Sequence, residues 1–238
     1  MKKAERILTA ILAMMMAFNL TACGGNQGGE SATGSFSQEA SEPNTGDKTS
    51  SRDTVIYGWS NEPSTLDPHM TSDSTALGAC YQMYDMLIRE EKDGTLAPAL
   101  CTDYEYSEDM TDITFYLRED VKFHNGDVMT ADDVVFSLNR SIASAYTSKM
   151  TSAFESCEKV DDTTVVLHLK FPYAAAIGCL SNANCAIVNQ AVVEADEDWA
   201  LNNPVGTGAY QFKNWVTGAE INFEAFPDYF RGEAPIKN

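Results

Sequence analysis

The side chains best suited to catalysis or metal binding are three histidines, His69, His124 and His168. A zinc peptidase places two histidines in HExxH and a serine hydrolase places its nucleophile in GxSxG, and neither pattern surrounds these residues. His124 directly precedes Asn125 and Gly126, a pair that is typical of a tight turn. The sequence therefore does not predict an enzyme, and a hydrolytic enzyme is kept only as an alternative.

Two further motifs invite a ligand-binding interpretation. The first is a run of carboxylates: Glu194, Asp196, Glu197 and Asp198. No turn glycine or calcium-loop spacing accompanies this run, so a solvated helix face is favoured over a cation site. The second motif, residues 206–208, reads GTG and lacks both the third glycine of a dinucleotide loop and the lysine of a phosphate loop. It indicates a backbone turn that enters a strand. No metal and no cofactor is expected.

The six cysteines form no CxxC pair and no set at zinc-ligand spacing. Apart from Cys23, which follows a distinctive leader, they are Cys80, Cys101, Cys157, Cys179 and Cys185. Five thiols cannot all pair with one another. Buried free thiols are the favoured interpretation, and a disulfide between Cys179 and Cys185 in an oxidising compartment stays open.

The amino terminus has the pattern of an export signal. Three basic residues at positions 2, 3 and 6 precede an apolar run over 7–18 that is short for a membrane span. Residues 20–23 read LTAC, which resembles the lipobox of bacterial lipoproteins. We therefore expect a signal peptide over 1–22 and lipidation of Cys23, which would anchor the chain stably if more than one acyl chain is attached. The alternative is an ordinary cleaved signal with a coincidental cysteine.

Residues 23–52 are rich in Gly, Ser, Thr and Glu and hold one aromatic residue, so they predict a flexible tether. Sixteen basic and thirty-five acidic residues give the whole chain a net charge of −19. Such a charge repels phosphate backbones, which excludes nucleic acid as an expected partner.

Hydrophobic spacing predicts a mixture of helices and strands after residue 53. Alternating apolar residues indicate strands, and apolar residues three or four apart indicate helices. Thr130, followed by Asp132 and Asp133, predicts a capped helix that continues through Val134 and Leu138. The expected strands cover 55–59, 113–117, 165–169, 209–215 and 220–226, the last two as a hairpin. The other expected helices cover 74–88 and 190–200, and turns are expected at 93–94 and 125–126.

Several motifs, in this order, resemble the family 5 extracellular solute-binding proteins, which serve ABC importers of oligopeptides, dipeptides and nickel complexes. They are EPSTLDP at 62–68, YDML at 84–87, DGTLAPAL at 93–100, FYLR at 115–118, VKFHNG at 121–126, TADDVVFS at 130–137, NPVGTGAY at 203–210 and YFRG at 229–232. The resemblance runs from about residue 55 to the end. Ala209 stands where the family more often has proline.

The resemblance implies an α/β, periplasmic-binding-protein type II-like architecture. Residues 53–75 and 170–238 would form a first lobe, and 76–169 an accessory α/β subdomain inserted into it. Family members are about twice as long, so the second lobe is expected to be missing from this chain. Two lobes that close on a solute bury it and match its polar groups.

Within the first lobe, the resemblance implies that the loop of Glu62, Pro63, Ser64 and Thr65 lines the ligand cleft and bonds the backbone of an extended peptide. Glu62 would pair with a cationic group of the solute. The alternative is a solvated loop acid beside a turn-forming proline. Asn182 and Asn184 are further cleft candidates, again with a structural role as the alternative.

The function predicted from these features is a lipid-anchored binding component of an ABC transporter on the extracytoplasmic face of the cell membrane. It would bind oligopeptides or similar small solutes, with nickel chelates or haem as variants, and deliver them to permease subunits. A surface sensor or adhesin with the same fold is the main alternative. A fragment without independent binding is another.

Overall fold

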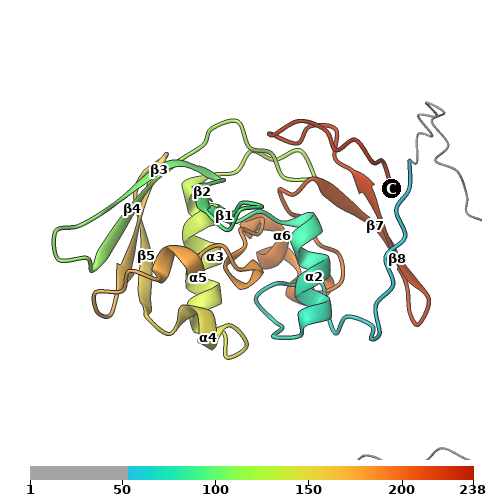
Figure 1. Cartoon of the computed structure of the whole chain (residues 1–238), viewed down its shortest axis with the longest axis horizontal. Coiled ribbons are helices and arrows are strands. Elements are labelled where there is room, and N and C mark those ends of the chain that lie inside the picture. The colour runs from blue at the N-terminus through green and yellow to red at the C-terminus, as the bar shows by residue number, and fades with distance from the viewer. Residues whose placement is uncertain (1–52) are drawn as a thin grey trace, which may run out of the picture. The chain divides into compact units, whose positions relative to one another are not determined.

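The computed structural model describes residues 53–238, so the predicted signal peptide, Cys23 and the tether lie outside the described residues. The helices and strands appear along the chain as follows: α2 (Ser74–Met83), β1 (Ile88–Glu90), β2 (Leu96–Pro98), β3 (Cys101–Tyr106), β4 (Asp112–Leu117), α3 (Ala131–Ala143), α4 (Ser148–Thr151), β5 (Phe154–Asp161), β6 (Thr164–Leu169), α5 (Ala176–Cys179), the 3-10 helix η1 (Ala183–Cys185), α6 (Gln190–Ala195), α7 (Glu197–Ala200), β7 (Tyr210–Val216) and β8 (Glu220–Ala225) (Figure 1).

One sheet has four antiparallel strands in the order β3-β4-β6-β5. The strands predicted over 113–117 and 165–169 are confirmed as β4 and β6, in which Phe115 pairs with Val165 and both side chains are fully buried. Their alternating apolar residues all face one side of the sheet, because side chains along a strand point to opposite faces in turn. Strands β3 and β5 were not predicted, since polar residues fill half of the positions of β3 and most of those of β5.

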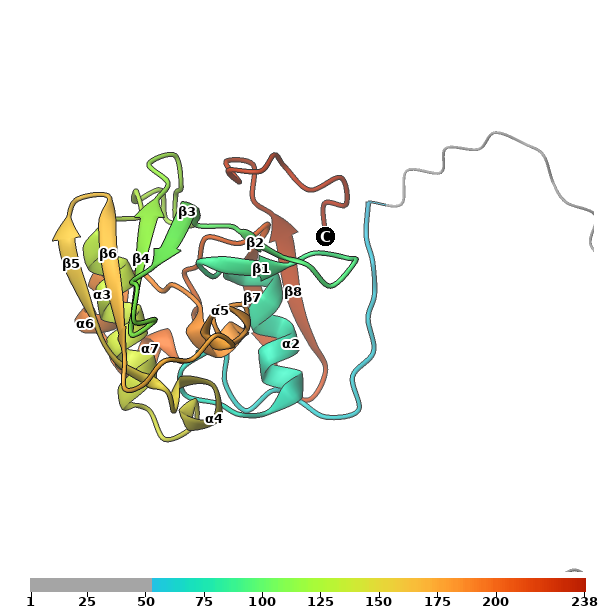
Figure 2. The same cartoon turned by 60° about the vertical axis from the view of Figure 1, so that its left-hand side comes forward.

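Helix α3 packs against this sheet and contacts β5 and β6 (Figure 2). The helix begins where it was predicted to begin, after Thr130. The Thr130 hydroxyl accepts a hydrogen bond from the Asp133 amide, and the Asp133 carboxylate accepts one from the Thr130 amide. This capping box satisfies amides that a helix start leaves unpaired. Val134 and Leu138 are buried in the core beneath the sheet.

A second hydrophobic core joins α2, η1, α6 and α7 to the predicted and now confirmed hairpin of β7 and β8. Helix α2 ends at Met83, earlier than the predicted end at residue 88. The backbone of Gly208 lies against this helix end and donates a hydrogen bond to the Met83 carbonyl (2.9 Å). The chain then turns away, and Leu87 and Ile88 are buried in the first core instead.

The helix predicted over 190–200 is two helices, α6 and α7, separated at Asp196. Asp196 has extended backbone angles (φ −160°, ψ 95°), which end α6, and its carboxylate accepts a hydrogen bond from the Trp199 amide at the start of α7 (2.9 Å). Aspartate favours such capping positions over helix interiors, which explains the break.

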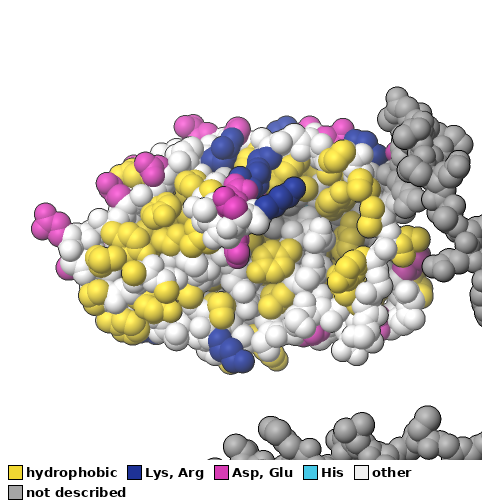
Figure 3. All heavy atoms as spheres, in the orientation of Figure 1, with side chains coloured by type: hydrophobic (Ala, Val, Ile, Leu, Met, Phe, Trp, Pro, Cys, Tyr) yellow, Lys and Arg dark blue, Asp and Glu magenta, His cyan; other side chains and the backbone are white. Residues whose placement is uncertain are grey.

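The strand predicted over 55–59 is wrong, because these residues form no strand. Val55 donates a backbone hydrogen bond to Asn238, but Ile56 and Tyr57 are 93% and 76% exposed. A strand needs a neighbour to pair its amides and carbonyls, and apolar spacing alone does not supply one. Hydrophobic side chains are visible on the face where this segment and the β7–β8 hairpin run (Figure 3).

The five cysteines of the described residues are free, and four of them are buried, as the favoured interpretation predicted. Of the helices within residues 53–238, none is both long enough and apolar enough to cross a membrane. The boundaries of the predicted lobe and subdomain stay a prediction. The four-stranded sheet lies within 76–169, whereas α2 shares its core with Leu66 and Val188.

Candidate functional site

A surface hollow in the described part of the chain has a volume of about 690 Å³, larger than a second hollow of about 290 Å³. Three segments form its walls. They are the loop that begins at Glu62, the pair Asn202 and Asn203, and strand β7 with the turn after it. Its lining residues are Glu62, Pro63, Ser64, Asn202, Asn203, Phe212, Lys213, Asn214, Trp215 and Thr217. Three of the predicted cleft residues therefore lie together in one hollow.

Glu62 is joined to the hairpin across this hollow. Its Oε1 atom accepts hydrogen bonds from the indole Nε1 of Trp215 (2.7 Å) and from the amide of Gly218 (2.9 Å). Gly218 has φ +73°, a turn conformation that glycine adopts without steric strain. Glu62 is solvent-exposed, yet it is more than a freely solvated loop acid, because its carboxylate links the loop to β7.

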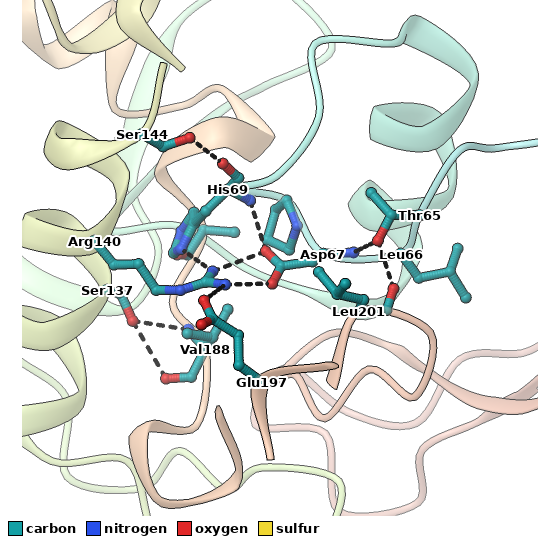
Figure 4. Close-up of polar contacts among 12 residues, drawn as sticks. Thr65, Leu66, Asp67, His69, Ser137, Arg140, Ser144, Val188, Glu197 and Leu201 are labelled. Carbon is teal, nitrogen blue, oxygen red and sulfur yellow. Dashed lines mark hydrogen bonds and ion pairs between the residues drawn. The ribbon is translucent and has the colours of Figure 1, made fainter. Parts of the chain in front are cut away.

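Thr65, the fourth predicted loop residue, is buried behind the hollow and holds the loop in place. Its hydroxyl donates to the Leu201 carbonyl (2.6 Å) and accepts from the amide of Asp67 (3.2 Å). The Leu66 amide donates to the same Leu201 carbonyl (2.8 Å). The loop and the segment that begins at Leu201 thus form adjoining walls with a fixed spacing (Figure 4).

A buried ion pair holds the loop from the other side. Arg140, from α3, donates from Nη1 to Asp67 Oδ1 (2.9 Å) and from Nη2 to Asp67 Oδ2 (2.7 Å). Nη2 also donates to Glu197 of α7 (3.0 Å), and Nη1 lies 3.1 Å from His69 Nδ1. Figure 4 shows the guanidinium reaching from α3 between these three side chains. The Asp67 side chain is only 3% exposed, so this pair is screened from water.

The two predicted asparagines lie elsewhere. Asn184 is buried, and its amide donates to the carbonyls of Pro68 (2.7 Å) and Thr71 (3.0 Å), so it supports the same loop from beneath. Asn182 caps η1 by accepting from the Asn184 amide (3.0 Å). Neither lines the hollow with Glu62. Ligand contact by any of these residues stays a prediction.

His69 is a neutral member of the Arg140 cluster. Because Nδ1 faces a guanidinium N–H, it accepts, and Nε2 therefore carries the proton donated to the Ala186 carbonyl (2.9 Å). Complete burial lowers the pKa of His69 from 6.5 to about 4. Protonation would place a second N–H group against Arg140, so an acid-charged His69 does not fit this arrangement.

This buried histidine is expected to make the fold acid-sensitive. Between pH 6.5 and 4 His69 is protonated in the unfolded chain but neutral in the folded chain, so stability falls as pH falls. His69→Gln keeps a neutral donor and acceptor and should remove about 2 to 3 kcal/mol of the loss between pH 7 and pH 4.5. Urea unfolding at both pH values measures this difference.

The comparison of His69→Gln with the natural chain isolates one group. His124, whose pKa burial also lowers, and Asp85, whose pKa burial raises to about 7, are present in both proteins. Asp85 has the opposite effect on stability, because below pH 7 the folded chain binds a proton at Asp85 that the unfolded chain does not bind until lower pH. An unchanged pH dependence in His69→Gln would contradict the assignment.

The smaller hollow, of about 290 Å³, contains three carboxylates, those of Asp127, Asp133 and Glu194. Asp133 is already used in the cap of α3 and also accepts from the Gln190 amide (3.0 Å). Among residues 53–238, no three His, Cys, Asp or Glu side chains are grouped so as to hold a metal ion. The larger hollow, with about 690 Å³ against about 290 Å³, has more room for a solute and is the better candidate for solute contact.

Asp67, Arg140 and Trp215 were not identified from the sequence as parts of the site. Asp67 lies in the quoted EPSTLDP motif, and an acid within a loop expected at a cleft was an available signal. Arg140 and Trp215 carried no such signal, because they reach the loop from positions 73 residues after Asp67 and 153 residues after Glu62.

The fold is shared with solved solute-binding proteins. The structure of Haemophilus influenzae OppA in complex with RPPGFSPFR superposes with a TM-score of 0.67 at 30% identity, covering 71% of this chain and 37% of that one. NikZ from Campylobacter jejuni in complex with Ni(L-His) gives a TM-score of 0.68 at 25% identity, covering 76% and 37%. The predicted α/β, type II binding-protein fold class is thereby confirmed, and it places the chain in the class of solute-binding proteins.

The chain belongs to the bacterial extracellular solute-binding proteins of family 5. Residues 95–238 match the family described as "Bacterial extracellular solute-binding proteins, family 5 Middle". The periplasmic oligopeptide-binding protein OppA of Haemophilus influenzae is 29% identical over 206 residues, which cover 77% of this chain and 38% of the relative. The chain thus spans about two fifths of the length of that relative.

Proposed function

We propose that the protein is the lipid-anchored binding component of an ABC importer and that it captures oligopeptides or similar small solutes outside the cytoplasmic membrane. Membership of family 5 supports the transport role. The observation that carries the proposal is the hollow in which the loop of Glu62, Pro63 and Ser64 faces the aromatic strand β7. Permease subunits are the proposed protein partners, and Cys23 is the proposed anchor.

The chemistry of the hollow suits a peptide backbone. Asn202, Asn203 and Asn214 present amides that can donate and accept, which matches the alternating N–H and C=O groups of an extended peptide. Phe212 and Trp215 add apolar surface for side chains. The one ammonium group in the lining, that of Lys213, is already paired with Glu224 (3.1 Å), so the hollow offers little free positive charge.

The test begins with protein extracted from its own membrane. Mass spectrometry of the intact chain should find acyl groups on Cys23, and an unmodified Cys23 would remove the anchor from the proposal. The same preparation is then titrated with mixed tri- to nonapeptides in a calorimeter. Saturable heat with peptides supports the proposal. Heat with nickel–histidine but not with peptides contradicts the peptide assignment. The absence of binding heat with every solute contradicts it as well.

Trp215 should be the most informative residue in that titration. Trp215→Ala removes both a wall of the hollow and the donor to Glu62, and we expect peptide affinity to fall at least tenfold, which corresponds to about 1.4 kcal/mol. Trp199→Ala is the matched control, since Trp199 is 49% exposed on α7 and does not line the hollow. Equal losses in the two variants would argue against binding in this hollow.

A further inference from the structure

The guanidinium of Arg140 connects segments that are distant in the sequence. It contacts Asp67, which follows the Glu62–Thr65 loop, and Glu197 in α7. It also contacts Nδ1 of His69, whose Nε2 is hydrogen-bonded to the Ala186 carbonyl. Arg140 itself belongs to α3, which packs on the four-stranded sheet and does not line the hollow. One side chain from outside the hollow therefore reaches two of the segments that lead into its walls.

Few residues separate each of these two contacts, at Asp67 and at Glu197, from the wall of the hollow that it supports. Asp67 follows Ser64 closely, and Thr65 between them is hydrogen-bonded both to the Asp67 amide and to the Leu201 carbonyl. On the other side, α7 ends at Ala200, and Leu201 leads directly into Asn202. Arg140 is therefore linked to the loop wall through Asp67 and to the asparagine wall through Glu197.

We propose that Arg140 is a positioning residue for solute binding, which fixes the distance between the Glu62–Ser64 wall and the Asn202–Asn203 wall without touching the solute. This inference rests on the proposed function only for its effect on affinity. Its structural part, the placement of the walls, holds whatever the solute is.

An arginine is needed here because of its geometry. Its planar group carries donors that meet both oxygens of Asp67 while a further donor reaches Glu197. A lysine ammonium is a single point of charge on a flexible stem and does not span these acceptors together. Arg140→Lys should therefore keep the charge balance of the cluster but lose the fixed spacing.

The ligand-free readout is the indole N–H of Trp215, whose hydrogen bond to Glu62 reports the position of the loop. The chain has three tryptophans, and the Trp215 cross-peak in a ¹H–¹⁵N spectrum is assigned with Trp215→Phe. In folded Arg140→Lys this cross-peak should shift or broaden. Exchange of the Leu66 and His69 amides, which are bonded to Leu201 and Asp67, should speed up by about tenfold or more.

Arg118→Lys is the matched control. Arg118 also donates two hydrogen bonds to one carboxylate, that of Asp120. This pair lies on the surface, and neither residue lines the hollow. It should leave the Trp215 cross-peak and the loop exchange unchanged. Glu197→Gln is the second test variant, because this carboxylate is 61% exposed and its loss is compatible with folding. It should shift the same cross-peak less than Arg140→Lys does.

Peptide titration completes the test and separates this inference from the proposed function. We expect about tenfold weaker binding in Arg140→Lys and unchanged binding in Arg118→Lys. If the natural chain binds no peptide while Trp215 still shifts in Arg140→Lys, the positioning role stands and the peptide function fails. A folded Arg140→Lys with natural Trp215 signals, exchange and affinity overturns the inference. If Arg140→Lys does not fold, unchanged signals in Glu197→Gln overturn it.

Discussion

Replacing Gly208 with alanine is expected to lower the free energy of unfolding by about 3 kcal/mol or more. A methyl carbon at this position would lie 2.5 Å from the carbonyl carbon of Met83, 2.7 Å from the amide nitrogen of Tyr84 and 2.8 Å from the carbonyl oxygen of Gln82. All three are backbone atoms at the end of α2, so no side-chain rotation relieves the overlap. The end of α2 and the backbone of residues 206–208, which lead into β7, must therefore move apart.

Chemical denaturation of Gly208→Ala measures this loss, and Gly58→Ala is its control. A methyl carbon at Gly58 would meet nothing within 4 Å, so that variant should stay within about 0.5 kcal/mol of the natural chain. A Gly208→Ala protein as stable as Gly58→Ala would mean that α2 and the GTG turn are not packed as described.

The same turn explains a pair of sequence motifs that had no evident connection. The His124 amide donates to the Gly206 carbonyl (2.8 Å), and the ring of His124 accepts from the Gly206 amide (3.3 Å) and bonds the Gly208 carbonyl (3.0 Å). VKFHNG at 121–126 and the GTG of residues 206–208 therefore form one backbone junction. His124 lies in a turn and the GTG residues lead into β7, as the sequence predicted.

Local signals in the sequence were sufficient where a single element determines its own structure. The cap at Thr130 and the alternation around Phe115 each involve residues a few positions apart, and both elements form as predicted. The segment 55–59 has an equally clear apolar pattern but depends on pairing with a neighbour, and no strand forms. Local pattern thus predicts which residues prefer a strand, not whether a partner is present.

The candidate site shows the same limit. The loop at 62–65 was predicted to line a ligand cleft, which stays a prediction; Glu62, Pro63 and Ser64 line the larger hollow. What holds this loop was beyond local inference, because Asp67 and Arg140 are 73 positions apart and Asn184 supports Pro68 from 116 positions away. Long-range polar contacts of this kind leave no periodic trace in one sequence.

Replacing Arg140 with methionine is expected to cost about 3 to 5 kcal/mol of stability, because it leaves the Asp67 carboxylate charged, buried and without its cation. Among the described residues, no buried side-chain nitrogen or oxygen lacks a hydrogen-bond partner, so the variant would introduce a defect that this structure avoids. His69 would lose the donor at Nδ1 as well. Denaturant unfolding of the purified chain at pH 7 measures the loss.

Arg118→Met is the matched control, since it removes a similar arginine–aspartate pair in which the Asp120 side chain is 60% exposed. Its cost should be at most about 1 kcal/mol, because water replaces the lost partner. The contrast tests burial and not charge, as each variant removes one arginine. Adding Asp67→Asn to Arg140→Met should recover part of the lost stability, because the buried charge is then gone while Oδ1 can still accept from the His69 amide. Equal costs for the two arginines, or no recovery in the double variant, would show that the Asp67 charge is not held in a dry interior.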